Sequence, residues 1–548
     1  PAHVGERREL DRASSHDQQD PVGLITFSRG FNNFSWEIEM NQYNRAVWVD
    51  DYCAPFGPTP SPPESRVPPG FLRPSTLPVT EIRDAVNEAA LGVFALSLAV
   101  DLLWMPVQVG DSLGEILGAQ QSPSTWASFT DSFGTEAYLR PLRIAQIKGL
   151  FDLAQGSHYW LAYRGFHALL LIAAVMLFMR ALRVSTTVDL AASAFALVVL
   201  FGLYTFRGTV REAFPINHFL EMVVLSLATL NLAQSRGGLW VDVGAGLTFV
   251  VAALTLESGL LVWVVAVGAW AVGWRGVSVR GLAMMTTLLV CYAYIRFVHL
   301  ATGLPALSER SAGYLIEMLD PPALQERFGA QPLWFYAYNV LASISSVLFS
   351  EPQDGIFETA YSKVHAQPMW RIVMPVVTSI LTTGVIVWAA ARRVWRKVPF
   401  DDTARALAVF LLVLVANATL SFAYAQDEIM SVAGAFYALA AFGATRDALL
   451  SGPTLRPVAA IGCAALLCTL AVGWSVRTAG VHYVLRSQAV KHQIDWVELP
   501  GRWERSHQWP SDPAEQRLIL QLRNDAVQVP LPNTRVDRPE WPSRLWLE

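Results

Sequence analysis

Apolar runs of about 16 to 23 residues recur between residues 86 and 476 and alternate with polar segments. A helix of that length crosses a hydrocarbon layer about 30 Å thick, and a backbone in lipid satisfies its own hydrogen bonds best as a helix. The runs cover residues 85–105, 159–182, 187–205, 218–232, 240–256, 259–274, 279–300, 333–349, 372–391, 404–423, 430–449 and 457–476. The pattern predicts an all-α polytopic membrane protein.

The composition supports this class. Charged residues make up 16% of the chain, whereas soluble proteins carry about 25%. The net charge of −4 gives no indication of nucleic-acid binding, and the four cysteines have no metal-site spacing. The frequent Ala, Leu, Val and Arg are typical of a GC-rich bacterium, so we expect the bacterial cytoplasmic membrane.

Short basic loops predict the orientation, because Lys and Arg concentrate on the cytoplasmic side. These loops are residues 180–183, 234–238, 274–280, 391–397 and the loop holding Arg446 and Arg456. The loops at 107–158, 206–217, 301–332 and 425–429 then fall outside. If all twelve runs crossed the membrane, the basic loops before and after residues 301–371 would fall on opposite sides. We therefore expect residues 333–349 to be re-entrant or interfacial, leaving about eleven crossings.

Three regions follow from these boundaries. Residues 1–83 are polar and Pro-rich and are predicted to form a cytoplasmic arm. Residues 84–476 form the transmembrane domain, whose first outward loop is 107–158. Residues 477–548 form an extracytoplasmic tail, which is too short for a large core and is expected to pack on the membrane domain.

The first outward loop holds the most suggestive chemistry. Asp111 emerges just beyond the first span, Glu115 follows one helical turn later, and Arg140 and Arg143 close the stretch. A carboxylate followed by arginines could supply a base and a phosphate clamp, because the planar guanidinium binds phosphate oxygens in pairs. The alternative is a solvated loop with ordinary charges.

The predicted orientation gathers more polar residues on the same face. They are the acids Asp111, Glu115, Glu212, Glu257, Asp427 and Glu428, the arginines Arg140, Arg143, Arg207 and Arg211, and the nearby histidines His158, His218 and His365. Such a face suits a lipid-phosphate substrate. Arg207 and Arg211 could equally be interfacial anchors, and Glu257 could cap the helix that follows it. Asp427 and Glu428 could be turn acids, and His158 and His218 could be structural.

The order of these features resembles the C-fold (GT-C) membrane glycosyltransferases, especially the protein O-mannosyltransferase-like branch. GDSLGE, with Asp111, stands where the family has an early acid, and YLRPL, with Arg140, matches an Arg-Pro-Leu element. YRGFHALLL, Arg211-Glu212 and LTLESGLLV, with Glu257, are also similar. Leu256 stands where the family has lysine, and Asp427 stands where an arginine is expected. The resemblance covers about residues 85–450.

The resemblance implies inverting transfer of a sugar from a polyprenyl-phosphate donor to an extracytoplasmic protein, lipid or glycan. Asp111, with Glu115, would supply the catalytic base. The substrate-binding residues would be Arg140, Arg143, Arg207, Arg211, Glu212, Glu257 and Asp427. A divalent metal, Mg or Mn, is compatible with the family, although no ligand cluster requires one. The alternatives are a non-catalytic scaffold subunit of a membrane complex and a transporter of a lipid-linked precursor.

Overall fold

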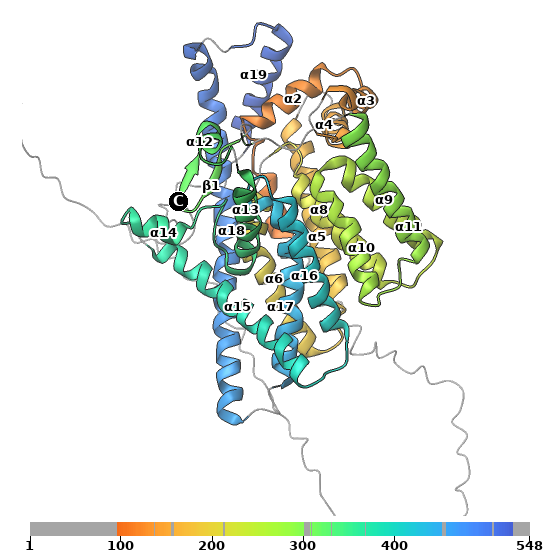
Figure 1. Cartoon of the computed structure of the whole chain (residues 1–548). Coiled ribbons are helices and arrows are strands. Elements are labelled where there is room, and N and C mark those ends of the chain that lie inside the picture. The colour runs from red at the N-terminus through yellow and green to blue at the C-terminus, as the bar shows by residue number, and fades with distance from the viewer. Residues whose placement is uncertain are drawn as a thin grey trace, which may run out of the picture. The chain divides into compact units, whose positions relative to one another are not determined.

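The computed structural model describes residues 96–135, 138–154, 158–211, 214–300, 307, 310–329, 331–367, 369–451, 456–506 and 509–529. The predicted arm 1–83 and the start of the first predicted span lie outside these residues. The described residues are mostly helical (Figure 1). Residues 96–103 end the first span as a helix.

After the helix over residues 96–103, the described part of the predicted outward loop and of the first half of the bundle contains eleven helical segments. They are α2 (Asp111–Gln121), α3 (Thr125–Thr135), α4 (Pro141–Leu153), α5 (Tyr159–Leu182), α6 (Thr187–Gly202), α7 (Tyr204–Arg211), α8 (His218–Gln234), α9 (Leu239–Thr255), the 3-10 helix η1 (Glu257–Leu260), α10 (Leu261–Ala271) and α11 (Val279–Ala293). Polar side chains fix several helix starts. Thr186 and Asp189 form a capping box at α6, and Asn217 caps α8.

The second half begins with a π-helix, η2 (Tyr294–His299), which continues α11. It is followed by a small antiparallel pair and further helices. These are β1 (Ala312–Tyr314), β2 (Glu317–Leu319), α12 (Pro321–Phe328), α13 (Pro332–Phe349), α14 (Glu358–Val364), α15 (Trp370–Trp395), α16 (Asp402–Leu420), the 3-10 helix η3 (Asp427–Met430), α17 (Ser431–Ser451), α18 (Pro457–Ser506) and α19 (Pro513–Gln528).

Seven helices in the described part of the chain are long and apolar enough to cross a membrane. They lie in α5, in α11 with η2, in α13, α15 and α16, in η3 with α17, and in α18, and four shorter apolar helices accompany them. Large apolar side chains such as Met176, Val290, Ile380 and Leu411 are exposed on these helices. Exposed apolar surface of this extent suits lipid rather than water. The all-α membrane class is therefore supported, and the count of about eleven crossings stays a prediction.

Helix α17 lies at the centre of the bundle. Its span is 89% buried, and it packs against α6, α8, α13, α15 and α16. The helix can be enclosed because its buried face is rich in small residues, including Ala433, Gly434, Ala438 and Ala441. Small side chains let neighbouring backbones approach closely in a membrane bundle.

The end of α13 lies beside the middle of α15. The Leu348 carbonyl accepts a hydrogen bond from Thr383 (2.6 Å), and the Ser350 and Ser379 hydroxyls are 2.7 Å apart. The chain then turns back, and the Phe357 amide donates to the Leu315 carbonyl beside β1 (2.7 Å). This path is consistent with a re-entrant segment at residues 333–349, although the helix is long enough to span.

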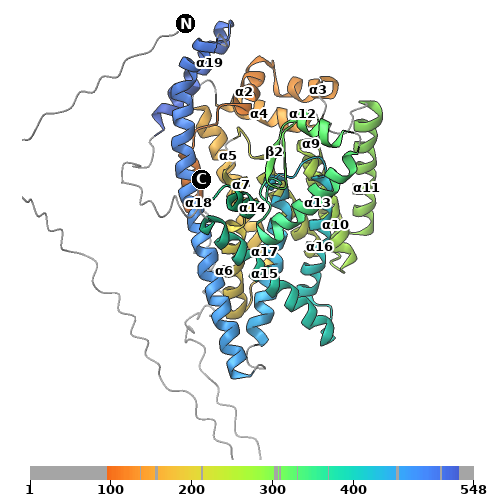
Figure 2. The same cartoon turned by 60° about the vertical axis from the view of Figure 1, so that its left-hand side comes forward.

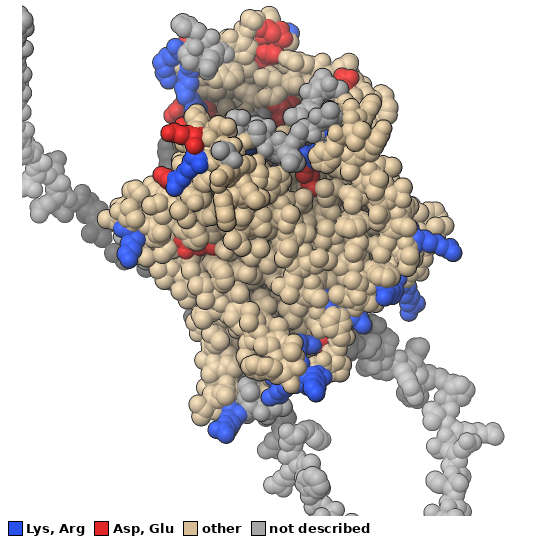
Figure 3. Space-filling model, in the orientation of Figure 1, with Lys and Arg blue, Asp and Glu red and all other residues tan. Residues whose placement is uncertain are grey.

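The charged side chains gather at the two ends of the described bundle. Figure 3 shows Lys and Arg with almost no Asp or Glu at the end opposite α2 and α19, charges of both signs at the other end, and a broad, largely uncharged surface between them. In Figure 1, the predicted outward elements α2, α3, α4 and α12 all lie at the end away from the basic loops. This separation is what the charge pattern of the loops predicts.

Helix α18 joins the last apolar run to the predicted tail without a break. It is 50 residues long, runs along α6, and is followed by α19, which folds back against it (Figures 1 and 2). Trp496, far beyond the predicted end of the span at residue 476, is buried and donates to the Val107 carbonyl (2.6 Å). Together α18 and α19 share a hydrophobic cluster with α2, α4 and α5.

Candidate functional site

A cavity of about 330 Å³ lies at the predicted outward end of the bundle. It is formed where the start of α4, the segment before α8, η1, η2 and the segment between α16 and η3 meet. Four arginines, Arg140, Arg143, Arg296 and Arg310, and one glutamate, Glu257, line it among the described residues. These five residues sum to three positive charges, and Glu115, the ion-pair partner of Arg143 outside the lining, reduces the excess to two, so the cavity is suited to an anion.

Arg140 and Glu257 form the central ion pair of the cavity. The Arg140 Nε lies 3.1 and 2.9 Å from the two Glu257 carboxylate oxygens, and Nη2 lies 2.5 Å from Oε2. Arg296 Nη1 is 3.4 Å from Glu257 Oε1. One carboxylate therefore bridges two guanidinium groups, holds them side by side and offsets one of their two positive charges.

Local backbone structure explains why these side chains meet. Arg140 is the N-cap residue of α4, and Pro141 fixes the first helical turn after it. Glu257 follows the extended residue Leu256 at the tight reversal between α9 and η1. A Cβ on Gly259 would lie 2.1 Å from the Ala252 carbonyl oxygen, so only glycine fits this reversal. Glu257 lies in the first turn of η1, as a helix-start acid would, and its carboxylate also accepts hydrogen bonds from Arg140.

The electrostatics keep Arg140 charged. Burial by itself lowers the pKa of Arg140, but the Glu257 carboxylate outweighs burial and raises that pKa above its ordinary value. The Tyr138 ring lies 4.4 Å from the Arg140 guanidinium carbon, which adds a cation–π contact. At the opposite wall, Arg310 Nη1 donates to the Tyr424 hydroxyl (2.9 Å). Arg140 and Arg310 are thus each positioned by specific partners in the cavity wall.

Arg143 joins the cavity to α2 in the first predicted outward loop. It lines the cavity and forms an ion pair with Glu115 of α2. The Glu115 carboxylate is therefore engaged by a cation. Asp111 is the first residue of α2, one turn before Glu115, and its side chain lies outside the described part of the structure. The sequence assignment of Asp111 as a base stays a prediction.

The remaining predicted residues fall in three groups. Arg207 and Arg211 lie in α7 with side chains outside the described part, and Glu212 is itself outside the described residues. Asp427 is buried and accepts a hydrogen bond from the Asp354 amide (2.9 Å), while its own amide donates to the Asp354 carboxylate (3.1 Å). This reciprocal contact fixes η3, and both its N-cap residue Gln426 and its own Ile429 line the cavity. His365 is exposed at the end of α14.

Sequence reasoning missed Arg296 and Arg310. Arg296 lies in the π-helix η2, inside the apolar run 279–300. An arginine in a membrane span is costly and usually functional, and π-helical turns often occur at functional sites, so its position in that run was a usable indication. Arg310 is a charge in a polar loop and had no comparable feature.

A metal centre is not evident in the described part of the chain. No group of three or more His, Cys, Asp or Glu residues there is placed to hold a metal ion. The divalent metal that the resemblance allows therefore stays a prediction.

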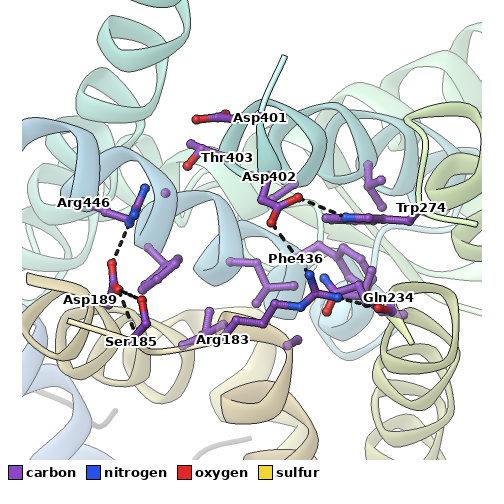
Figure 4. Close-up of a pocket in the computed structure, with 18 residues that line it drawn as sticks. Arg183, Ser185, Asp189, Gln234, Trp274, Asp401, Asp402, Thr403, Phe436 and Arg446 are labelled. Carbon is purple, nitrogen blue, oxygen red and sulfur yellow. Dashed lines mark hydrogen bonds and ion pairs between the residues drawn. The ribbon is translucent and has the colours of Figure 1, made fainter. Parts of the chain in front are cut away.

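A second cavity, of about 390 Å³, lies among the basic loops at the other end of the bundle (Figure 4). Its charged residues pair with one another. Arg446 Nε is 2.6 Å from the Asp189 carboxylate, and Asp402 accepts from the Trp274 indole (3.3 Å) and faces Arg183 (3.8 Å). Among the described lining residues, aspartates outnumber arginines. This cavity is less suited to an anion than the outward one.

The chain matches no protein-family profile, no curated protein and no solved structure. Any functional conclusion therefore rests on the residues and geometry of the chain itself.

Proposed function

We propose that this chain is a membrane glycosyltransferase that takes a sugar from a polyprenyl-phosphate donor at the extracytoplasmic face. The observation that carries the proposal is the outward cavity, in which four arginines face one glutamate at one end of an apolar helical bundle. A lipid-linked phosphate fits such a site, because its tail stays in the bilayer while its headgroup meets the arginines.

The arginines suit the chemistry of sugar transfer. When the bond between the sugar and the phosphate breaks, negative charge develops on the departing phosphate. Fixed cations aimed at that charge lower the barrier, because they need no rearrangement during the reaction. Arg140 and Arg296 are already held side by side by Glu257, so they can bind the phosphate oxygens with little loss of freedom.

A transporter for the same class of lipid is the second candidate. The end of α13 lies beside the middle of α15, where buried Arg477 donates to the Ser350, Thr378 and Ser379 hydroxyls at 2.8 to 3.0 Å. Polar groups and helix ends within a bundle are common features of transporters. A transporter would bind the lipid phosphate but would not break the sugar–phosphate bond.

A transfer assay tests the proposal. Purified protein in detergent is mixed with solubilised membranes as a source of acceptors and with radiolabelled polyprenyl-phosphate mannose, glucose or arabinofuranose. We expect one donor to be converted to polyprenyl phosphate with its label on an acceptor. Arg140→Ala should lower the rate roughly 100-fold, because a charge-assisted contact worth up to about 3 kcal/mol is lost.

Arg327→Ala is the matched control. Arg327 lies in α12 at the same end of the bundle and forms an exposed ion pair with Glu317 (2.7 Å), so its loss should leave the rate unchanged. Binding of the donors without conversion of any of them would contradict the glycosyltransferase and favour the transporter. No binding of any donor would favour a scaffold subunit.

A further inference from the structure

His218, which lines the outward cavity, forms a buried histidine–carboxylate pair with Glu221. His218 is the first residue of α8, is 5% exposed, and lines the cavity together with Arg140 and Glu257. Its Nδ1 lies 3.2 Å from Glu221 Oε2, one helical turn further on. The other Glu221 oxygen accepts a hydrogen bond from Gln146 of α4 (2.8 Å).

These contacts fix the proton on one side of the imidazole ring. Each Glu221 oxygen faces a donor, and an ionised carboxylate only accepts hydrogen bonds. The proton of neutral His218 therefore lies on Nδ1, and Nε2 offers a lone pair. Nε2 is buried and has no hydrogen-bond partner among the described residues. A buried acceptor without a hydrogen bond destabilises the ligand-free protein, and a ligand hydroxyl at Nε2 would offset that cost.

A second histidine nearby shows what a purely structural histidine looks like in this protein. His167 of α5 is fully buried, and both of its ring nitrogens are used. Nδ1 lies 3.1 Å from Arg164 Nη1, and Nε2 lies 3.1 Å from the Asn217 side-chain amide. His218 lines the cavity and differs in having one ring nitrogen bound to Glu221, while the other, Nε2, is buried without a partner among the described residues. Ser258 Oγ, in the same wall, is also buried without a partner among the described residues.

We propose that His218, oriented by Glu221, is the catalytic residue that takes the proton from the attacking hydroxyl in sugar transfer. The inference rests on the proposed function and assigns the base to a described side chain rather than to Asp111. The acceptor oxygen attacks the anomeric carbon, and its proton moves to Nε2. The bond between the anomeric carbon and the phosphate oxygen breaks, and its electron pair leaves with the polyprenyl phosphate.

The surroundings of His218 support both the proton transfer to its imidazole and the departure of the phosphate. Glu221 supplies a negative charge beside the imidazolium that forms, as the carboxylate does in other histidine–carboxylate pairs. The phosphate that leaves is held by the arginines of the same cavity. The imidazolium then returns its proton to solvent, and the site is ready for another donor.

The experiment compares His218→Asn with wild type in the transfer assay across a range of pH. Asparagine places an amide nitrogen near Nδ1, so the contact with Glu221 can persist while the base is lost. We expect transfer to fall by about 10²- to 10⁴-fold, with binding of the donor lipid within threefold of wild type. Retained binding also reports that the variant is folded.

The pH profile distinguishes a base from a structural residue. The wild-type rate should rise with pH as His218 loses its proton and then reach a plateau, and the residual rate of His218→Asn should lack this rise. Glu221→Gln should move the midpoint of the rise to lower pH, because the imidazolium loses its counter-charge. His365→Gln is the control, since His365 is exposed and its Nδ1 contacts the Tyr361 carbonyl of its own helix (2.9 Å).

The outcomes separate this inference from the proposed function. Wild-type transfer with an unchanged rate and pH profile in His218→Asn would overturn the inference alone, and loss of transfer in Asp111→Asn would then assign the base to Asp111. Absence of transfer by the wild type from all three donors would overturn the proposed function and this inference together.

Discussion

At the residue scale, Glu257 sets the charge balance of the outward cavity and the positions of two of its arginines. Its carboxylate is the nearest counter-ion of Arg140 and also contacts Arg296. In the absence of a ligand, it keeps two cations from repelling each other in a partly buried space. A phosphate that enters the cavity has to share these arginines with Glu257 or displace it. Glu257 is thus expected to hold the arginines in position and to compete with an anionic ligand.

Glu257→Gln should change ligand affinity and stability in opposite directions. The neutral amide no longer competes for the guanidinium groups, so polyprenyl phosphate should bind about tenfold more tightly, or about 1.4 kcal/mol. The ligand-free protein should melt at a lower temperature, because two arginines then lack their shared carboxylate. Titration of detergent-purified protein with the lipid measures the first effect, and a thermal melt measures the second.

Weaker binding by Glu257→Gln would show that the carboxylate contacts the ligand directly. Arg327→Ala serves as the control for a charge change at the same end of the bundle, because its exposed ion pair with Glu317 is expected to contribute little.

The sequence indicated some of these residues but not their contacts. Arg140 and Glu257 could be placed on one face from the order of basic and polar loops. Their ion pair joins positions 117 residues apart, and no local pattern specifies such a contact. His218 could be structural or catalytic on the sequence alone, and only the geometry shows that one of its nitrogens has no partner among the described residues.

At the element scale, close contact between α6 and α18 anchors the long C-terminal helix. A Cβ on Gly202 would lie 2.8 Å from the Trp474 ring and 3.1 Å from the Arg477 Cβ. Trp474 in turn donates from its indole to the Thr382 hydroxyl of α15 (2.8 Å). The glycine therefore permits α6, α15 and α18 to pack around one buried tryptophan.

Gly202→Ala should destabilise this packing by roughly 1–3 kcal/mol, because the added methyl group overlaps an aromatic ring that has no space to move. The thermal melting temperature in detergent should fall. Gly165→Ala is the matched control, since a Cβ at Gly165 of α5 meets nothing within 4 Å. That substitution should be neutral or slightly stabilising, and equal effects of the two would contradict this account of the contact.

The continuation of α18 could not be predicted from hydropathy. The apolar run ends near residue 476, and residues 477–506 contain enough charged and polar side chains to resemble a solvated tail. The helix persists because one of its faces packs on α2, α5 and α19, where Trp496 and Leu499 are buried. Partners distant in sequence supply that surface, so a local pattern does not reveal it.

At the scale of the whole molecule, the central question is which segments cross the membrane. The charge pattern predicts that residues 333–349 do not cross fully, and the structure brings the chain after α13 back to β1 through the Phe357–Leu315 hydrogen bond. By length and apolar composition, α13 could still span. The side on which α14 lies distinguishes these two topologies.

Cysteine labelling tests this topology. Single cysteines at Thr125, Arg236 and Lys363, all exposed, are introduced into a variant without the four native cysteines. In sealed right-side-out vesicles, an impermeant thiol reagent should label positions 125 and 363 and leave 236 unlabelled until the vesicles are opened. Labelling of 363 together with 236 would show that α13 crosses the membrane.

The most direct test of the central claim is binding of undecaprenyl phosphate to the purified protein in lipid nanodiscs. We predict saturable binding that weakens about 10- to 100-fold in Arg140→Ala, which loses charge-assisted contacts, and stays within twofold of wild type in Arg327→Ala. Binding that is unaffected by Arg140→Ala, or equal binding of the uncharged undecaprenol, would contradict the claim that the outward cavity binds a lipid-linked phosphate.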